Sequence, residues 1–249
     1  MGTLRTLFAI TVVFAHSYGF VFVGGKNAVQ LFYMISGFLI SYVLVERKVY
    51  KSTRSFYINR YLRIYPIYFV VALLSLATFV FASAIGKEVD FFKVYRDAPF
   101  AANILLVFSN ATIFFQDWVM FSAVENREFV FSANFLKSEV VLYPALLVPQ
   151  AWTLGVELTF YLMAPFILAR RQFLLLLLAL SIALRVYLLY IGLGKSDPWT
   201  YRFFPTELAL FLLGALAHQV LLPFYRKTLL GGGGYLKHLP TYQRIFSSL

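Results

Sequence analysis

The chain has 249 residues, of which 61% are hydrophobic and 13% are charged, and its mean hydropathy is +0.75. This composition excludes an ordinary soluble domain and indicates an integral membrane protein. We assign the net charge of +11 to membrane topology and anionic lipid rather than to nucleic acid, because the basic residues gather in short segments between apolar stretches. The chain has no cysteine, which excludes disulfides and thiolate chemistry, and we expect neither a metal nor a permanently bound cofactor.

Apolar stretches recur along the chain at the length of a membrane-spanning helix, roughly 18 residues. Residues 6–23, 28–45, 64–85 and 172–193 approach or exceed this length. Residues 151–169 and 206–222 are long enough but contain Glu157, Glu207 and His218, and residues 98–116 are a weaker candidate. The sequence therefore predicts an all-α, polytopic integral membrane helical bundle with six or seven transmembrane helices.

The basic residues predict an orientation. Residues 46–63, ERKVYKSTRSFYINRYLR, carry six basic residues and one acidic residue, so this segment and the N-terminus are expected on the cytoplasmic side of the inner membrane. Residues 86–150 either cross the membrane twice or lie at its outer surface. Residues 1–230 are expected to form the transmembrane domain, and residues 231–249 a glycine-rich linker with a short polar tail.

Arg5 and His16 lie eleven positions apart in the first apolar stretch, LRTLFAITVVFAH. Eleven residues make almost three helical turns, so the two side chains share one stripe and lie about 16 Å apart along the axis. A histidine at membrane depth either exchanges protons or is a neutral imidazole satisfied by a neighbouring helix. Glu157 lies about 8 Å into its own helix, where an unpaired carboxylate is costly, so we expect a histidine or an arginine of the bundle as its partner, for function or for packing.

Arg60 and Arg63 are an i, i+3 pair that shares one face of a helix. Two guanidiniums at the cytoplasmic surface suit a phosphate or pyrophosphate, and the alternative is contact with lipid headgroups. Other polar and small residues are expected to be structural. Gly37, Gly214 and Ser36 are expected to be close-packing points, Arg185 a mid-span base without an identified partner, and Glu207 a neighbour of Arg202.

Four stretches, in this order, resemble the membrane-bound acyltransferase family 3, whose members O-acylate carbohydrates of the cell surface and related acceptors. They are Arg5-x10-His16, AVQLFYMISGFLI (28–40), FYINRYLRIYP (56–66) and AWTLGVELTFYLMAP (151–165). LVFSNATIFF (106–115) and ELALFLLGALA (207–217) are weaker matches. The sequence departs from the family in having Leu158 at the second acid of the last stretch. It also has six or seven helices where about ten are usual, as in a fragment, a truncated gene product or a short variant.

The resemblance implies a reaction in which an acyl group, commonly acetyl, passes from coenzyme A to a hydroxyl of a carbohydrate or lipid-linked glycan. It implies catalytic roles for His16, Arg5 and Glu157 and donor binding by Arg60 and Arg63. The histidine would act as a base or as an acyl relay. A transporter or flippase with an intramembrane relay through His16, Glu157 and Arg185 is the second class of function, and a non-catalytic remnant is the third.

Overall fold

The computed structural model describes residue 10 and residues 24–230. Arg5, His16 and the predicted tail at residues 231–249 lie outside the described residues. In the described part, helices make up nearly all of the regular structure, and β1 (Ser122–Glu125) and β2 (Glu128–Phe131) form a single antiparallel hairpin. The predicted helical membrane bundle is confirmed.

Four described helical segments are long and apolar enough to cross a membrane. They are Gly25–Glu46, Thr53–Ala84, Arg171–Tyr190 and Phe204–Thr228. The first consists of α2 (Gly25–Ser41) and a π-helical turn (Tyr42–Glu46), and the second and third are α3 (Thr53–Ala84) and α7 (Arg171–Tyr190). The fourth begins as α8 (Phe204–Leu216) and continues through another π-helical turn (Ala217–Leu221) into α9 (Leu222–Leu230).

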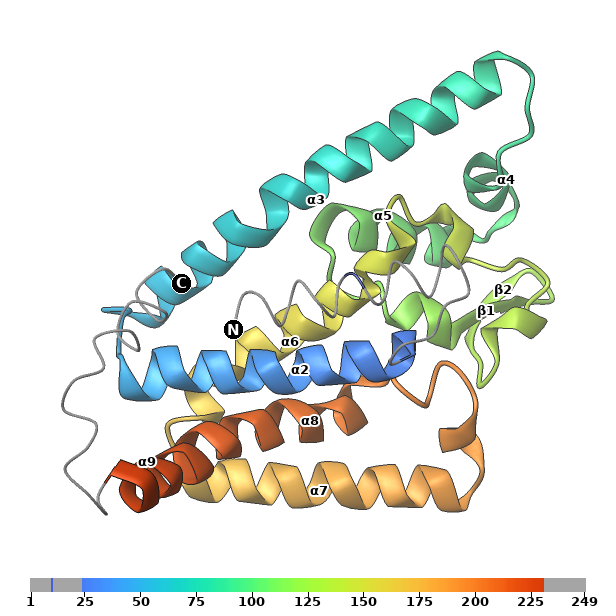
Figure 1. The fold of residues 1–249 in the computed structure, drawn as a ribbon. Coiled ribbons are helices and arrows are strands. Elements are labelled where there is room, and N and C mark those ends of the chain that lie inside the picture. The colour runs from blue at the N-terminus through green and yellow to red at the C-terminus, as the bar shows by residue number, and fades with distance from the viewer. Residues whose placement is uncertain (1–9, 11–23, 231–249) are drawn as a thin grey trace.

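The region between α3 and α6 (Trp152–Ile167) resolves a question that the sequence left open. It contains α4 (Asp90–Asp97), α5 (Phe100–Thr112), the β-hairpin and short 3₁₀ turns at Trp118–Phe121, Phe135–Lys137, Tyr143–Ala145 and Pro149–Ala151. Its longest helix, α5, has 13 residues. At 1.5 Å per residue α5 is about 20 Å long, short of the roughly 30 Å hydrocarbon core. Residues 86–150 therefore cap one end of the bundle (Figure 1).

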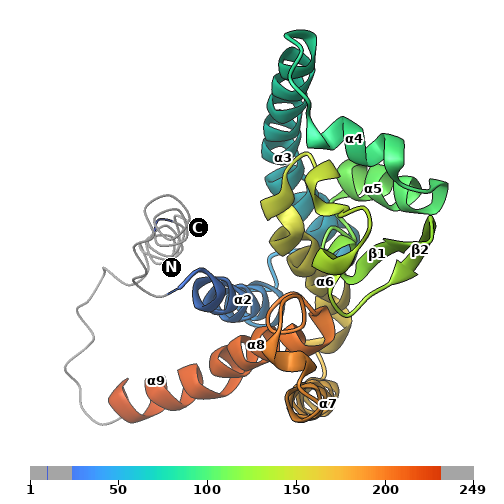
Figure 2. The same ribbon diagram turned by 90° about the vertical axis from the view of Figure 1, so that its right-hand side faces the viewer.

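The core of the bundle is the contact between α2 and α8, with α6 and α7 beside it, as the view in Figure 2 shows. A Cβ atom added to Gly37 would lie 1.8 Å from the Phe211 carbonyl oxygen, and one added to Gly214 would lie 1.9 Å from that of Met34. Both glycines are therefore close-packing points, as predicted. The Phe211 ring stacks between Tyr33 and Phe160, at centroid distances of 4.6 and 4.3 Å, which joins α8 to α2 and α6.

The bundle has two chemically different ends. At the basic end, defined as the end where residues 47–63 lie, α2 finishes, α3 begins, and the C-terminal part of α6 lines a cavity with Leu44 and Val45. His218 and Arg226 also bond to Glu46 there. At the opposite end, Gln30 near the start of α2 approaches Thr200 and Glu207. The antiparallel helices thus gather Arg170, Arg171, Arg226 and Lys227 at the same end as the 47–63 segment.

Helix α3 diverges from the other helices along its length (Figure 1). Only 11% of its apolar window is buried, against 39% for the segment that contains α8. The exposed side chains of α3 are mostly large and apolar, as for Ile67, Leu73 and Leu74. Such a surface fits contact with lipid tails.

Candidate functional site

Glu157 lies in α6 and accepts hydrogen bonds from two hydroxyls. Ser36 Oγ donates from α2, and Tyr161 Oη donates from one turn further along α6. Both donors are hydroxyls of described residues, whereas the sequence predicted a histidine or an arginine as the partner of Glu157. The expectation that Ser36 is only a packing point is wrong, because its hydroxyl is buried against a carboxylate, where a hydrogen bond stabilises the charged group.

Arg60 is buried near the beginning of α3, with 8% of its surface exposed. Its Nη2 donates to the Tyr50 hydroxyl at 3.2 Å, and its guanidinium lies 5.3 Å from the Phe56 ring centre and 5.5 Å from that of Tyr161. Two aromatic faces can stabilise a buried cation without neutralising it. The Nε–H has no hydrogen-bond partner in the described structure, so the guanidinium keeps unused donor capacity.

Arg63 lies one turn further along α3, and the predicted helical i, i+3 pair is present. The two side chains differ in environment, however, since Arg63 is exposed and Arg60 is buried. Beside this part of α3 is a cavity of about 270 Å³, which we call the basic-end cavity. Its lining is mostly apolar and includes Leu44, Tyr50, Phe56 and Pro165.

Tyr161 connects the two candidate groups. Its hydroxyl donates to Glu157, and its ring lies against the Arg60 guanidinium. The structure therefore brings Glu157, Arg60 and Ser36 together from α6, α3 and α2, although 121 positions separate Ser36 from Glu157 along the chain. The Glu157 carboxyl group thus lies inside the bundle, and the Arg60 guanidinium lies on the other side of the Tyr161 ring, toward the basic end.

Arg185 pairs with Glu207, which supplies the partner that the sequence did not identify for Arg185. The Arg185 Nη2 to Glu207 Oε1 distance is 2.5 Å, and the Glu207 side chain is fully buried. Arg202 binds Asp197, with Nε to Oδ1 at 2.7 Å, and lies 4.2 Å from the centre of the Trp152 ring.

Asp117 is a buried acid that sequence reasoning missed. Its carboxylate lies near the start of α6, where an added Gly155 Cβ would be 3.5 Å from Oδ1. Burial raises the pKa of Asp117 from 3.8 to about 7, while hydrogen bonds from its own and the Trp118 backbone N–H oppose the shift. The only signal in the sequence is one acid among the aromatic residues of FFQDW.

His218 belongs to a second buried polar group, at the basic end. Its Nδ1 lies 3.0 Å from Ser41 Oγ, and its Nε2 lies 2.9 Å from Glu46 Oε2. Glu46 also accepts from Arg226 at 3.1 Å. These contacts join the two π-helical turns that end α2 and α8, and they tie the helices together at that end.

Comparison with known families gives the family of the chain. A family model described as an acyltransferase domain matches residues 2–231. No match was found among curated proteins or among solved structures. The matched range covers all the described helices and the residues that carry Arg5 and His16. Because the family match spans most of the chain, and because the helices form the expected membrane bundle, the chain belongs to the membrane-bound acyltransferase family 3.

Proposed function

We propose that the protein is a membrane-bound O-acyltransferase that moves an acyl group, acetyl in the simplest case, from acyl-CoA to a hydroxyl of a carbohydrate or lipid-linked glycan. The observation that carries the proposal is the connected group of Ser36, Glu157, Tyr161 and Arg60 in a chain of the acyltransferase family. The basic end faces the cytoplasm of a cell with an inner membrane, in accord with the positive-inside rule.

The donor binds at the basic end. Arg63 is exposed on α3 and meets the phosphates of coenzyme A, while Arg60 supports the same face from its buried site. Guanidinium forks bind phosphate oxygens in a bidentate manner, and the basic-end cavity gives an apolar chain a place beside them. The exposed charges of this end also attract an anionic donor from solution.

The chemistry needs a base, because a sugar hydroxyl is a poor nucleophile. His16 removes the hydroxyl proton as the oxygen attacks the thioester carbonyl, the new C–O bond forms, the C–S bond breaks, and coenzyme A leaves as the thiol. Arg5 lies on the same predicted helical stripe. A relay through an acyl-histidine would give the same products. Glu157, fixed by Ser36 and Tyr161, is the carboxyl group of the proposed catalytic site.

The test uses purified full-length protein in lipid nanodiscs, radiolabelled acetyl-CoA, and the release of coenzyme A as the readout. His16→Ala is expected to lower the rate by about a hundredfold or more, the usual contribution of a general base. Arg63→Ala is expected to raise KM for acetyl-CoA by about tenfold, whereas Arg54→Ala, an exposed arginine in the first turn of the same helix, leaves it unchanged.

Three results would overturn parts of the proposal. Equal rates for wild type and His16→Ala would remove the catalytic role of the histidine. No turnover in any folded form would favour a non-catalytic remnant. A proton flux across liposomes in the absence of acyl-CoA would favour a transporter, although the pairing of Arg185 with Glu207 takes one member out of the predicted relay.

A further inference from the structure

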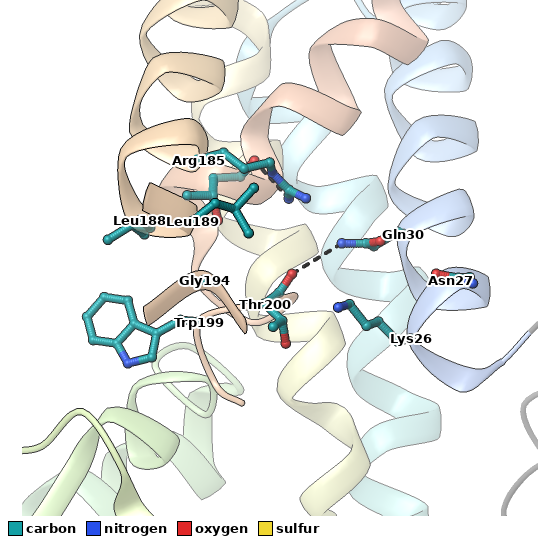
Figure 3. A pocket seen from close by; sticks show the side chains of 10 residues that line it. Lys26, Asn27, Gln30, Arg185, Leu188, Leu189, Gly194, Trp199 and Thr200 are labelled. Carbon is teal, nitrogen blue, oxygen red and sulfur yellow. Dashed lines mark hydrogen bonds between the residues drawn. The ribbon is translucent and has the colours of Figure 1, made fainter. Parts of the chain in front are cut away.

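The opposite end of the bundle contains a second cavity, of about 180 Å³, which we call the Lys26 pocket. Residues from α2, from α7, from the segment that joins α7 to α8 and from the start of α8 surround it (Figure 3). Two of its ten lining residues are basic and none is acidic; the lining consists of Lys26, Asn27, Gln30, Arg185, Leu188, Leu189, Gly194, Trp199, Thr200 and Thr206. Neither the donor site nor the group around Glu157 uses any of these side chains.

The positive charge of the pocket is available to a ligand. Lys26 is exposed, and the ion pairs of the described residues do not include it. Arg185 is held by Glu207 and by the Thr206 carbonyl, yet its Nε–H has no partner in the described structure. The buried Glu207 fixes Arg185 from behind and also interacts electrostatically with Lys26, so two cations face one carboxyl group and at least one positive charge is left in excess. Such a lining favours an anionic group.

The neutral part of the lining suits hydroxyl groups and a ring. Gln30 Nε2 makes only long contacts, 3.4 Å to the Thr200 carbonyl and 3.3 Å to Glu207, so its amide can turn to a ligand at little cost. Trp199 is fixed by a 3.0 Å bond from Nε1 to the Ala133 carbonyl and by ring contacts with Phe121 and Phe203. A rigid aromatic wall beside amide and hydroxyl groups is typical of a small-molecule pocket.

The size and position of the pocket limit further which ligands can bind there. At about 30 Å³ per water molecule, the volume corresponds to about six waters, which is room for one small ring. Gln30 and Leu44, which line the two cavities, are fourteen residues apart in one helical segment, or about 21 Å. Ser36, which bonds to Glu157, lies between them. The Lys26 pocket and the basic-end cavity therefore lie on opposite sides of the Glu157 group.

We propose that the Lys26 pocket binds an acidic sugar unit of the acceptor, one hexose ring that carries a carboxylate or a phosphate. This assignment rests on the proposed acyltransferase function, since it gives that reaction its acceptor subsite. Lys26 binds the anionic group with support from Arg185, Gln30 and Thr200 bind hydroxyls, and Trp199 covers the apolar face of the ring.

The first test is equilibrium binding to full-length protein in nanodiscs of neutral lipid, without any acyl donor. The probes are glucuronate, glucose 6-phosphate, glucose and glycerol 3-phosphate. We expect one or both of the acidic sugars to bind, and Lys26→Glu to weaken that binding by about tenfold or more. Lys87→Glu is the matched control, because Lys87 is an exposed lysine beyond the far end of α3 that does not line the pocket. Its affinity should equal that of wild type.

Several outcomes would overturn the inference. If glucose bound as tightly as the acidic sugars, the ligand would not need an anionic group. If glycerol 3-phosphate bound as tightly as the acidic sugars, a lipid headgroup would suffice as the ligand. Acidic-sugar binding that Lys26→Glu leaves unchanged, or no binding of either acidic sugar, would also contradict it. Coenzyme A release from acetyl-CoA, measured on the same preparations, tests the proposed reaction separately. Sugar binding without turnover would support the Lys26 pocket and contradict the proposed acyltransferase reaction. Turnover without sugar binding would support the reaction and contradict the pocket.

Discussion

At the scale of single residues, the hydroxyl of Tyr161 has a role that can be separated from that of its ring. Tyr161→Phe keeps the ring beside Arg60 and removes one donor to Glu157. Because a hydrogen bond to a charged group contributes about 1.5–3 kcal/mol, we expect acetyl transfer to fall by about tenfold to a hundredfold. The melting temperature should also fall by several degrees, because the same bond stabilises the folded protein. The measurement is kcat for transfer in nanodiscs.

Tyr57→Phe is the matched control for this prediction. Tyr57 also lies between α3 and α6, but its hydroxyl donates to the Leu162 carbonyl at 2.8 Å rather than to a carboxylate. Activity in this variant should stay close to that of wild type. An equal loss in both variants would show that general packing of α3 against α6, and not the bond to Glu157, sustains the reaction.

Asp117 predicts a pH-dependent stability. Burial raises the pKa of this carboxyl from 3.8 to about 7, so between those values the folded protein binds a proton that the unfolded chain has lost. The free energy of unfolding therefore falls as pH rises through that window and stays lower above it. Asp117→Asn should be close to wild type at pH 4 and more stable at pH 8, by about 4 kcal/mol. Thermal unfolding at both pH values measures the difference.

The exposed Asp90 gives the control for Asp117. Asp90→Asn should shift the melting temperature equally little at both pH values, because solvent keeps its carboxyl hydrated. If Asp117→Asn were less stable than wild type at pH 8, the carboxylate would be a net stabilising group, and the proposed cost of its burial would be wrong.

Single residues also show how far sequence reasoning reaches. Glu157 and Arg60 stand out because charge is costly in a membrane helix, and that cost is visible in the sequence. Their partners do not stand out, since Ser36 and Tyr161 are ordinary residues of apolar helices until packing brings them to the carboxylate. The partner of Arg185 was missed for the same reason. It depends on the rotation of α7 against α8, which local periodicity does not determine.

At the scale of helices, the contact between α2 and α8 depends on the absence of side chains at Gly37 and Gly214. Gly37→Ala would place a methyl group 1.8 Å from a backbone oxygen, which the neighbouring helix can accommodate only by moving away. We expect a loss of stability of about 3 kcal/mol, at the upper end for overpacked cores. Thermal unfolding in nanodiscs is the measurement.

Gly86→Ala is the corresponding control. Gly86 has a φ of 79° and open space where the Cβ would lie, so the substitution meets backbone strain alone. Its cost should be about 1 kcal/mol. A Gly37→Ala protein as stable as Gly86→Ala would contradict the close approach of α2 and α8.

Helix boundaries were predicted where a change in apolar composition sets them, and they were missed where a capping residue sets them. The sequence predicted a span from residue 64, whereas α3 begins at Thr53, because Ser52 caps the helix by accepting from the Ser55 N–H at 3.2 Å. The π-helical turns after α2 and α8 were not predicted. They accompany the contacts of Glu46 and His218, which join residues 172 positions apart.

At the scale of the whole molecule, three sites follow one another along α2. They are the basic-end cavity, the Glu157 group and the Lys26 pocket. Composition predicted the bundle, and charge predicted which residues lie at its basic end. The order of the sites comes from helix packing, which sequence alone does not determine.

This order predicts that the acyl donor reaches the protein from one side of the membrane only. Because the sequence has no cysteine, single introduced cysteines can report the orientation of the protein without background labelling. Single cysteines at the exposed Lys51 and Lys87 mark the basic end and the far end of α3. In proteoliposome preparations that differ in the orientation of the protein, labelling of each cysteine by an impermeant maleimide gives the fraction of molecules with that end facing outward. Labelled acetyl-CoA is then added outside only. We predict that coenzyme A release rises in proportion to outward-facing Lys51→Cys; release that follows outward-facing Lys87→Cys instead would contradict donor binding at the basic end.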